Sequence, residues 1–386
     1  MAQSVSTNSS GTGSSETDAQ DVEPDNSVPT NIDLVDDKLY LGNLAAACDI
    51  PLLEKYQISH ILTIDSCPLP AKITHLPFVK TKFIQLCDIP REDILHHFED
   101  TYEFLRKAVE DKDGRYALVH CYFGVSRSAT IVLAYMMRKY EISLEDAQDR
   151  LKSRRSVIGP NYGFLSQLKL YEKMKFSIDK NNIFYKRFRL HVAADKVKSV
   201  KLLAPPFTDV IKKDPALHTV RPEPVVYRCK KCRRVLASAS NLLTHREKKS
   251  PLWFDFQGEE DASEMGSPIC AQMFFIEPIT WMSNVAQSLQ GKLHCPNQNC
   301  KSKLGSFSWV MGCVCPCGAK VQPAFYLVPS KVDRSTSVLN FTRTVVPQEF
   351  KRHGRVSRVT LGGIRTTGRT GRAQRNNLTK FPRGIG

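Results

Sequence analysis

A cysteine and an arginine separated by five residues, within the stretch 119–128, constrain the fold of this chain more than any other feature. An apolar run typical of a strand (116–119) precedes the stretch, and a run typical of a helix (128–140) follows it. In such a layout, the backbone N–H groups of a loop and a helix N-terminus converge on one point, which binds phosphate. The sequence therefore predicts a phosphate-binding loop that consists of Tyr122, Phe123, Gly124, Val125, Ser126 and Arg127.

The two residues that frame this loop point to phosphoryl transfer. The positive field that binds a phosphate also stabilises a thiolate, so Cys121 is the candidate nucleophile. Arg127 can hold two phosphate oxygens at once through its planar guanidinium group. A thiolate and a bidentate arginine in one loop predict a reaction that passes through a cysteinyl-phosphate, with no catalytic cofactor.

These residues resemble the signature of the cysteine-dependent protein phosphatases, which is His-Cys, five residues, Arg and then Ser. The ending 126–128, followed by residues 134–137, is similar to the dual-specificity branch. The resemblance implies hydrolysis of phosphotyrosine, with phosphoserine and phosphothreonine as further substrates. Phe123 departs from the family, because many members carry a small residue there, so its effect on the pocket stays open.

A thiolate that attacks a phosphate monoester needs an acid to protonate the leaving oxygen. The resemblance implies an aspartate on a loop upstream of the cysteine. Asp88 matches it, since it follows an apolar strand and precedes Pro90. The other reading of Asp88 is a solvated loop carboxylate. Glu92 and Asp93 are the alternative acids, and Asp93 is also a candidate helix cap.

The resemblance also implies supporting roles. Ser128 is expected to hydrogen-bond the sulfur and help it leave, with an ordinary helix N-cap as its other reading. We expect His120 to orient the loop, and Asn161 to give structural support. Phosphoinositide phosphatases of this fold tend to carry lysines in the loop, whereas Tyr122 and Phe123 are neutral. A phosphoprotein substrate is therefore favoured, and RNA triphosphatases of this fold stay open as an alternative.

Periodic apolar residues predict strands and helices that alternate along the first half of the chain. We expect strands at 34–41, 59–63, 78–86 and 116–119, and helices at 43–56, 93–105, 128–140, 144–151 and 162–176. This alternation predicts an α/β domain over residues 32–178, with a central, mainly parallel sheet flanked by helices, the cysteine-phosphatase fold. Residues 179–222 are basic and contain prolines, which predicts a linker.

Eight of the twelve cysteines lie between residues 229 and 317. The chain shows no signal-peptide pattern, and its longest apolar run, 129–137, is far shorter than a membrane span. We therefore expect a reducing compartment and no membrane partner. In such a compartment, closely spaced cysteines bind metal more often than they form disulfides.

The spacing predicts two structural zinc ions in a domain over residues 223–330, because closed sets of four ligands leave no open position for catalysis. One predicted set contains Cys229, Cys232, His245 and Cys270, and the other contains Cys295, Cys300, Cys315 and Cys317. Two alternatives stay open: His245 as a surface helix residue, and Cys313 in place of Cys315. We expect three further cysteines to be buried apolar thiols, namely Cys48, Cys67 and Cys87.

The formal net charge of +16 favours acidic partners, including nucleic acid. Residues 1–31 contain no Lys or Arg, and residues 351–386 contain no Asp or Glu. Such biased composition predicts disordered tails over 1–31 and 331–386.

Three segments of the second half, 227–234, 275–282 and 303–307, resemble the dual-specificity phosphatase 12 family. That family joins an N-terminal phosphatase to a C-terminal zinc domain, and the resemblance covers about residues 32–330. It implies a role in assembly of the large ribosomal subunit, in the nucleus and cytoplasm, with pre-ribosomal particles and ribosomal RNA as partners.

Two hypotheses therefore stay open. The protein is either a phosphatase of phosphoproteins or mainly a non-catalytic assembly factor that binds through its zinc domain. Zinc-dependent DNA recognition is less favoured, because the cysteine spacing does not repeat as tandem fingers.

Overall fold

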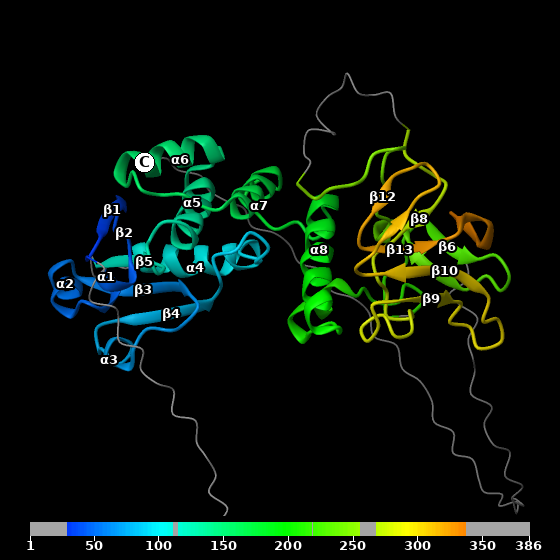
Figure 1. The fold of residues 1–386 in the computed structure, drawn as a ribbon, viewed down its shortest axis with the longest axis horizontal. Coiled ribbons are helices and arrows are strands. Elements are labelled where there is room, and N and C mark those ends of the chain that lie inside the picture. Colours follow the sequence, from blue (N-terminus) through cyan, green and yellow to red (C-terminus); the bar gives the residue numbers. More distant parts are fainter. Residues whose placement is uncertain (1–28, 111–114, 218, 255–267, 337–386) are drawn as a thin grey trace, which may run out of the picture. The chain divides into compact units, whose positions relative to one another are not determined.

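The computed structural model describes residues 29–110, 115–217, 219–254 and 268–336 (Figure 1). The disordered tails predicted at 1–31 and 331–386 fall almost entirely outside these ranges. Residues within the start of the second predicted tail form a strand, β14 (Val332–Ser335), which pairs with β6 (Val226–Cys229). The second domain thus continues past its predicted boundary at residue 330.

The first half of the chain is built on a five-stranded sheet with the order β1-β2-β5-β3-β4. Its strands are β1 (Ile32–Asp36), β2 (Leu39–Gly42), β3 (Ile58–Asp65), β4 (Lys80–Gln85) and β5 (Tyr116–His120). Strand β1 pairs antiparallel with β2, and all other pairs are parallel, so the predicted mainly parallel sheet is confirmed. The single strand predicted at 34–41 is wrong, since a turn with Lys38 at φ 53° divides it into two.

Helices cover both faces of this sheet, as Figure 1 shows. They are α1 (Leu44–Cys48), α2 (Ile50–Lys55), α3 (Ala71–Thr74), α4 (Phe98–Val109), α5 (Arg127–Tyr140), α6 (Leu144–Arg154) and α7 (Tyr162–Lys173). Neighbouring residues of β5 separate the two faces: Val119 belongs to the core that contains α4, α5 and α7, whereas Leu118 belongs to the core beneath α2 and α3. This alternation follows from the two-residue period of a strand.

The helix predicted at 43–56 is two helices. The side chain of Asp49 accepts a hydrogen bond from the backbone N–H of Leu52 at 3.1 Å, and so starts α2 with Pro51 in its first turn. Asn43 caps α1 in the same way, through the N–H of Ala46 at 3.0 Å. Two adjacent caps interrupt a pattern that otherwise reads as one helix.

The segment predicted as a linker, 179–222, contains the longest helix among the described residues, α8 (Ile183–Val200), followed by the 3-10 helix η2 (Pro205–Val210). Helix α8 is apolar on more than one side, which is typical of a buried helix. Phe188 belongs to the core of the first half, and Val197 belongs to the core of the second. This stretch is therefore an integral part of the fold.

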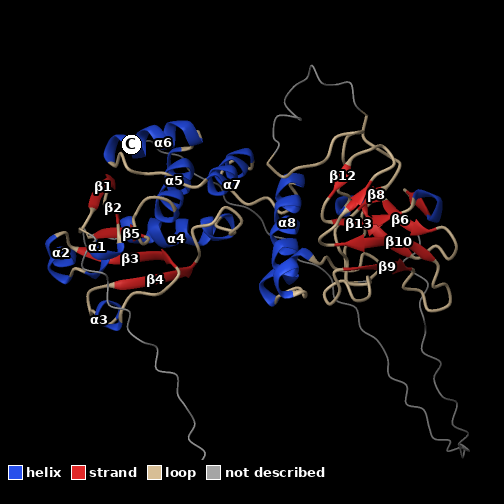
Figure 2. Cartoon of the chain, viewed as in Figure 1, coloured by secondary structure: helices blue, strands red, loops and turns tan. Residues whose placement is uncertain are grey.

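Strands predominate in the second half, as Figure 2 shows. In the described part of this half, three small antiparallel sheets have the orders β8-β13-β10-β9, β14-β6-β7 and β11-β12. The strands not yet given are β7 (Val235–Ser238), β8 (Phe274–Phe275), β9 (Gln290–His294), β10 (Lys303–Ser308), β11 (Cys313–Val314), β12 (Lys320–Val321) and β13 (Ala324–Leu327). Their shared core is centred on Trp309 and Phe325. Within the described residues, no helix combines the length and the apolar character that crossing a membrane requires.

Candidate active site and metal-binding groups

The predicted phosphate-binding loop connects β5 to α5. Its carbonyl oxygens are held by donors outside the loop: Tyr122 O by the N–H of Leu44 at 3.1 Å, and Val125 O by the N–H of Gly159 at 2.9 Å. Within the described part of the chain, the N–H groups of residues 122–127 donate to no protein acceptor. Outward carbonyls and uncommitted N–H groups are the arrangement that binds an anion.

The buried side chain of Arg155 supports the loop from below. Its Nε donates to the carbonyl of Gly124 at 3.0 Å, and its Nη1 contacts Asp33 Oδ2 at 2.6 Å. Gly124 has a φ of +68°, and a Cβ there would lie 2.3 Å from the carbonyl oxygen of Gly42. Glycine is therefore required at this point of the loop. No motif in the sequence predicted this role of Arg155.

Cys121 and Arg127 lie together at the base of the loop, and both are buried. The hydroxyl of Ser128 donates to Cys121 Sγ at 3.1 Å, and the N-cap of α5 is Ser126, so Ser128 lies inside the helix. This contact matches the role expected of Ser128 rather than that of a helix cap. Among the described residues, Arg127 Nε has no hydrogen-bond partner, which leaves this donor available for a phosphate oxygen.

Asp65, at the end of β3, orients Arg127. Its Oδ1 accepts from Arg127 Nη1 at 2.7 Å, and the carbonyl of Leu86 accepts from the same nitrogen at 3.2 Å. A buried guanidinium needs such a counter-charge to stay in place. Sequence reasoning missed Asp65, although its position at the carboxyl end of a parallel strand beside β5 was a usable signal.

Asp88 is held against the phosphate-binding loop. Its Oδ1 accepts from Ser126 Oγ at 2.7 Å and from Asn161 Nδ2 at 2.8 Å, and its Oδ2 lies 4.0 Å from Arg127 Nε. The backbone N–H of Asn161 also donates to Ser126 Oγ at 3.3 Å. Asn161 therefore links the carboxylate to the loop, in addition to capping α7 through the N–H of Phe164.

The two alternative acids have other partners. Asp93 accepts from the N–H of His96 at 3.0 Å, as expected of a cap, and it pairs with Arg189. Glu92 Oε1 lies 3.1 Å from Lys196 Nζ. Of the three candidate carboxylates, Asp88 is the one that contacts the loop.

His120 lies fully buried at the end of β5 and shares a hydrogen bond of 2.8 Å with Thr63 Oγ1 through Nε2. Burial lowers the pKa of His120 to about 4, against the opposing effects of the Asp65 charge and of a backbone bond to Cys121. A neutral, buried imidazole suits the orienting role that the sequence predicted.

Phe123 lies at the surface with 60% of its area exposed, and its ring meets that of Tyr122 edge-on at a centroid distance of 4.7 Å. Tyr162 is also exposed, at the start of α7. The bulky residue at position 123 therefore belongs to the rim of the site and not to its buried base.

The eight predicted metal ligands form two clusters of four, and in each the ligand atoms lie within 4.8 Å of one another. Group one is defined as Cys229, Cys232, Cys295 and Cys300, and group two as His245, Cys270, Cys315 and Cys317. In group one, Cys229 Sγ lies 3.8 Å from Cys300 Sγ, and Cys232 Sγ lies 3.5 Å from Cys295 Sγ. Zinc–sulfur bonds of about 2.3 Å in a tetrahedron place sulfurs roughly 3.8 Å apart, so the spacing fits zinc.

Comparison with known proteins identifies the family of this chain. Residues 39–174 match the family model described as the catalytic domain of dual specificity phosphatases. The chain is 41% identical to Dual specificity protein phosphatase MPK-4 of Drosophila melanogaster, over 82% of this chain and 91% of that protein. It is 34% identical to Dual specificity protein phosphatase 12 of Mus musculus, over 76% of this chain and 86% of that protein. The chain belongs to the dual-specificity phosphatase 12 family. It is a dual-specificity protein phosphatase.

In this member of the dual-specificity phosphatase 12 family, the predicted division of the metal ligands is wrong. The ligand pairs alternate along the chain: the turn between β6 and β7 meets the turn between β9 and β10, and together they form group one. The turn between β11 and β12 meets the segments of His245 and Cys270, which pair with each other through Cys270 N and His245 O at 2.9 Å. The order of the ligands along the chain does not predict their grouping, because the sheets determine which turns lie next to each other.

The two open points about ligands are resolved within the described residues. His245 is buried, and its Nε2 lies 3.3 Å from Cys317 Sγ, so it belongs to group two and is not a surface helix residue. Cys315 belongs to group two, whereas Cys313 lies outside both groups. Cys67 and Cys87 are exposed, so the prediction that they are buried thiols is wrong.

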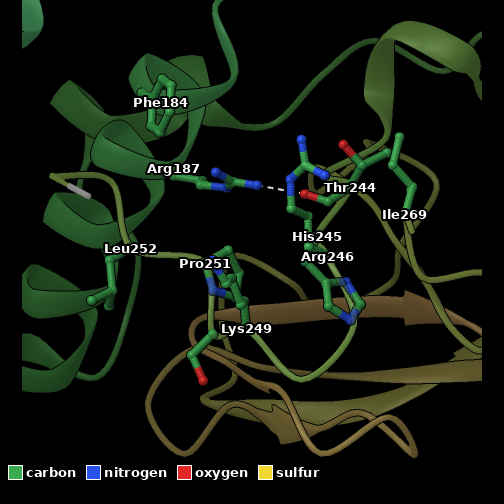
Figure 3. A pocket seen from close by; sticks show the side chains of 10 residues that line it. Phe184, Arg187, Thr244, His245, Arg246, Lys249, Pro251, Leu252 and Ile269 are labelled. Carbon is green, nitrogen blue, oxygen red and sulfur yellow. Dashed lines mark hydrogen bonds between the residues drawn. The ribbon is translucent and has the colours of Figure 1, made fainter. Parts of the chain in front are cut away.

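A cavity of about 150 Å³ lies beside group two, and Figure 3 shows its lining. Arg187 of α8 extends toward Thr244 and donates to its carbonyl oxygen. Arg246 and Lys249 also line the cavity, together with apolar side chains such as Leu252. The cavity is separate from the phosphate-binding loop, since none of the loop residues lines it.

Proposed function

We propose that the site hydrolyses phosphotyrosine, and also phosphoserine and phosphothreonine, in phosphoproteins through a cysteinyl-phosphate. The observation that carries the proposal is the placement of Asp88, whose carboxylate is hydrogen-bonded to Ser126 of the loop within 4.0 Å of Arg127. This placement of Asp88 beside Arg127, on the loop that follows Cys121, supports the proposed roles of acid, phosphate ligand and nucleophile.

In the first step, the thiolate of Cys121 attacks phosphorus while the bond from phosphorus to the ester oxygen breaks. Arg127 Nε and the loop N–H groups bind the equatorial phosphate oxygens, where charge develops. Asp88 delivers its proton to the leaving oxygen, so the alcohol or phenol departs neutral. The products of this step are the dephosphorylated side chain and a cysteinyl-phosphate.

In the second step, water attacks phosphorus as the sulfur–phosphorus bond breaks. The carboxylate of Asp88 takes a proton from that water, which restores the acid for the next cycle. Ser128 donates its hydroxyl hydrogen to Cys121 Sγ at 3.1 Å and stabilises the departing thiolate. Inorganic phosphate then leaves the loop.

A comparison of Cys121→Ser with Asp88→Asn tests this mechanism. Cys121→Ser is expected to reduce hydrolysis of a phosphotyrosine peptide to the background level. Asp88→Asn should lower kcat/KM, which reports the first step, roughly 10²-fold or more on that peptide. It should lower kcat/KM less on 4-nitrophenyl phosphate, because that leaving group is a stable anion without protonation. Equal losses on both substrates for Asp88→Asn would remove Asp88 from the acid role.

We also propose that both metal groups hold zinc and that the ions are structural. Thiolate-rich sets of four suit zinc, and a closed set leaves no position for substrate. The sulfur spacings of group one and the nitrogen–sulfur spacing of 3.3 Å in group two support this assignment. The ions would hold together segments of the second half that lie far apart in the sequence.

As a second function, we propose that the protein joins pre-ribosomal particles of the large subunit through its zinc domain, in the nucleus and cytoplasm. Two observations favour a ribonucleoprotein partner: the net charge of +16, and the cationic cavity beside group two that Arg187, Arg246 and Lys249 line. Lysine and arginine supply the sequence-independent attraction for RNA phosphates. Catalysis is not required for such binding.

Sedimentation of cell extracts at fixed salt concentration tests this second function. Wild type, Cys121→Ser and the control Cys313→Ser are expected to follow pre-ribosomal particles, whereas Cys229→Ser/Cys232→Ser should stay in the light fractions. If wild type does not co-sediment, the ribosomal proposal falls and the phosphatase function stands alone.

A further inference from the structure

Helix α8 lies beyond the residues that match the catalytic domain, which end at 174, yet it packs into the catalytic core. Four of its apolar side chains belong to the same core cluster as α4, α5 and α7, namely Phe184, Tyr185, Phe188 and Val192. The position of α8 is therefore fixed against the phosphatase domain by buried area. A helix held in this way can place its polar side chains reproducibly.

Two cations of α8 reach the loop that carries Asp88, defined as residues 86–93. Arg189 Nη1 forms an ion pair with Asp93 Oδ2, and both side chains are buried. Lys196 Nζ lies 3.1 Å from Glu92 Oε1. The second guanidinium nitrogen of Arg189 donates to Asp209 Oδ1 of η2 at 2.8 Å, which fixes the orientation of the guanidinium.

The same end of the loop is tied to the catalytic helices. Asp93 Oδ1 accepts from the N–H of His96 at 3.0 Å, at the start of the turn that leads into α4. Gln167 of α7 donates to the carbonyl of Glu92 at 2.8 Å. The Asp93 carboxylate thus binds both Arg189 of α8 and the backbone of the turn before α4, and these two contacts fix this end of the loop.

Loss of Arg189 would leave the Asp93 carboxylate buried without its cation, a state that proteins avoid by moving the charge toward water. The segment of loop between Asp93 and Asp88 is short, so such a movement displaces Asp88 as well. A general acid acts only within hydrogen-bond reach of the leaving oxygen, so a small displacement reduces proton transfer.

We propose that Arg189 is a positioning residue for the reaction, which acts through Asp93 to fix the loop that carries the acid. The proposal rests on the proposed role of Asp88. It extends the catalytic unit of this protein from the matched domain to α8 and η2. Arg189 itself contacts neither the substrate nor the reacting atoms.

The test measures kcat and KM of full-length variants on a phosphotyrosine peptide and on 4-nitrophenyl phosphate. Arg189→Met is expected to lower kcat/KM on the peptide by about tenfold, a part of the roughly 10²–10⁴-fold effect of a general acid in the first step. On 4-nitrophenyl phosphate it should lower kcat/KM less than about threefold. Lys198→Met is the matched control, since it removes a cation from the exposed last turn of the same helix, and it should leave both values unchanged.

Asp88→Asn, assayed alongside, separates the two proposals. If Asp88→Asn is selective for the peptide and Arg189→Met is not, the positioning role of Arg189 is overturned and the acid role of Asp88 stands. If Asp88→Asn shows no selectivity, the acid role itself fails. An equal loss on both substrates for Arg189→Met would indicate general damage to the fold and would also overturn the proposal.

Circular dichroism and thermal unfolding establish whether Arg189→Met is folded. If it is not, Asp93→Asn/Arg189→Met replaces it in the assay, because this pair removes both charges and retains the cap acceptor at position 93. No buried charge is left to move in the double variant, but the contact that ties position 93 to α8 is also absent, so a selective loss in the same direction is expected. A wild-type ratio between the two substrates would overturn the proposal.

Discussion

At the scale of single residues, His120 shows how the site depends on neutral as well as charged groups. It directly precedes the nucleophile, is fully buried and shares a hydrogen bond with Thr63. Its environment includes the charges of Asp65 and Arg127, and a backbone bond to Cys121. Burial has the largest effect and keeps the imidazole neutral, so that it can fix the end of β5 without adding charge beneath the phosphate.

The pKa of His120 predicts a loss of stability in mild acid. The folded-state pKa is about 4, below the ordinary value of 6.5, so the unfolded chain binds a proton in this range and the folded chain does not. The contribution is fully present above pH 6.5 and is lost as the pH falls toward 4. From pH 7 to pH 4.5, it removes about 2 kcal/mol of unfolding free energy.

Urea unfolding at pH 7 and pH 4.5 checks this expectation for wild type and His120→Gln. The variant should lose about 2 kcal/mol less than wild type between the two pH values. His191→Gln, which replaces an exposed histidine of α8, is the control and should keep the wild-type dependence. Parallel pH profiles for wild type and His120→Gln would contradict the assignment.

At the scale of elements, periodicity predicted the sheet and its helices because one face of each element is buried. Strands β3 and β4, and helices α5 to α7, lie where the pattern placed them, within a few residues. The pattern failed where a local cap interrupts it, as at Asp49, and where apolar residues occupy more than one side of a helix, as in α8. A helix with two apolar sides has no clear period, and its basic surface residues give the composition of a linker.

The residues of the candidate site also fall into those that the sequence could predict and those that it could not. The phosphate-binding loop could be predicted because its residues are contiguous, and its chemistry follows from their types. Arg155 and Arg189 could not, because each acts through a partner that the fold supplies, Gly124 and Asp93 respectively. Asp65 gave only the weaker signal of its place at the end of a strand, and its partner Arg127 is likewise supplied by the fold. Such pairs join elements that are distant in sequence, and a single sequence does not reveal them.

At the scale of the whole molecule, each metal group takes ligands from an early and a late segment of the second half. Two zinc modules that follow one another along the chain would not link these segments. Each group joins the first part of this half to the last, since Cys229 and Cys232 meet Cys295 and Cys300, and His245 and Cys270 meet Cys315 and Cys317. An ion that binds such distant segments only in the folded chain adds its binding free energy to folding and ties the two parts of this half together. The proposed zinc ions would thus stabilise the shared core around Trp309, rather than two separate modules.

This alternation predicts how paired ligand replacements change the zinc content. Cys229→Ser/Cys295→Ser affects group one twice and leaves group two intact, so about one ion per chain should remain by atomic absorption. Cys229→Ser/Cys270→Ser affects both groups, so the zinc content should approach zero. The control Cys313→Ser should retain two ions, because Cys313 lies outside both groups. Ligand sets that follow one another along the chain would give the opposite result for the two double variants, because Cys229 and Cys270 would then share a site.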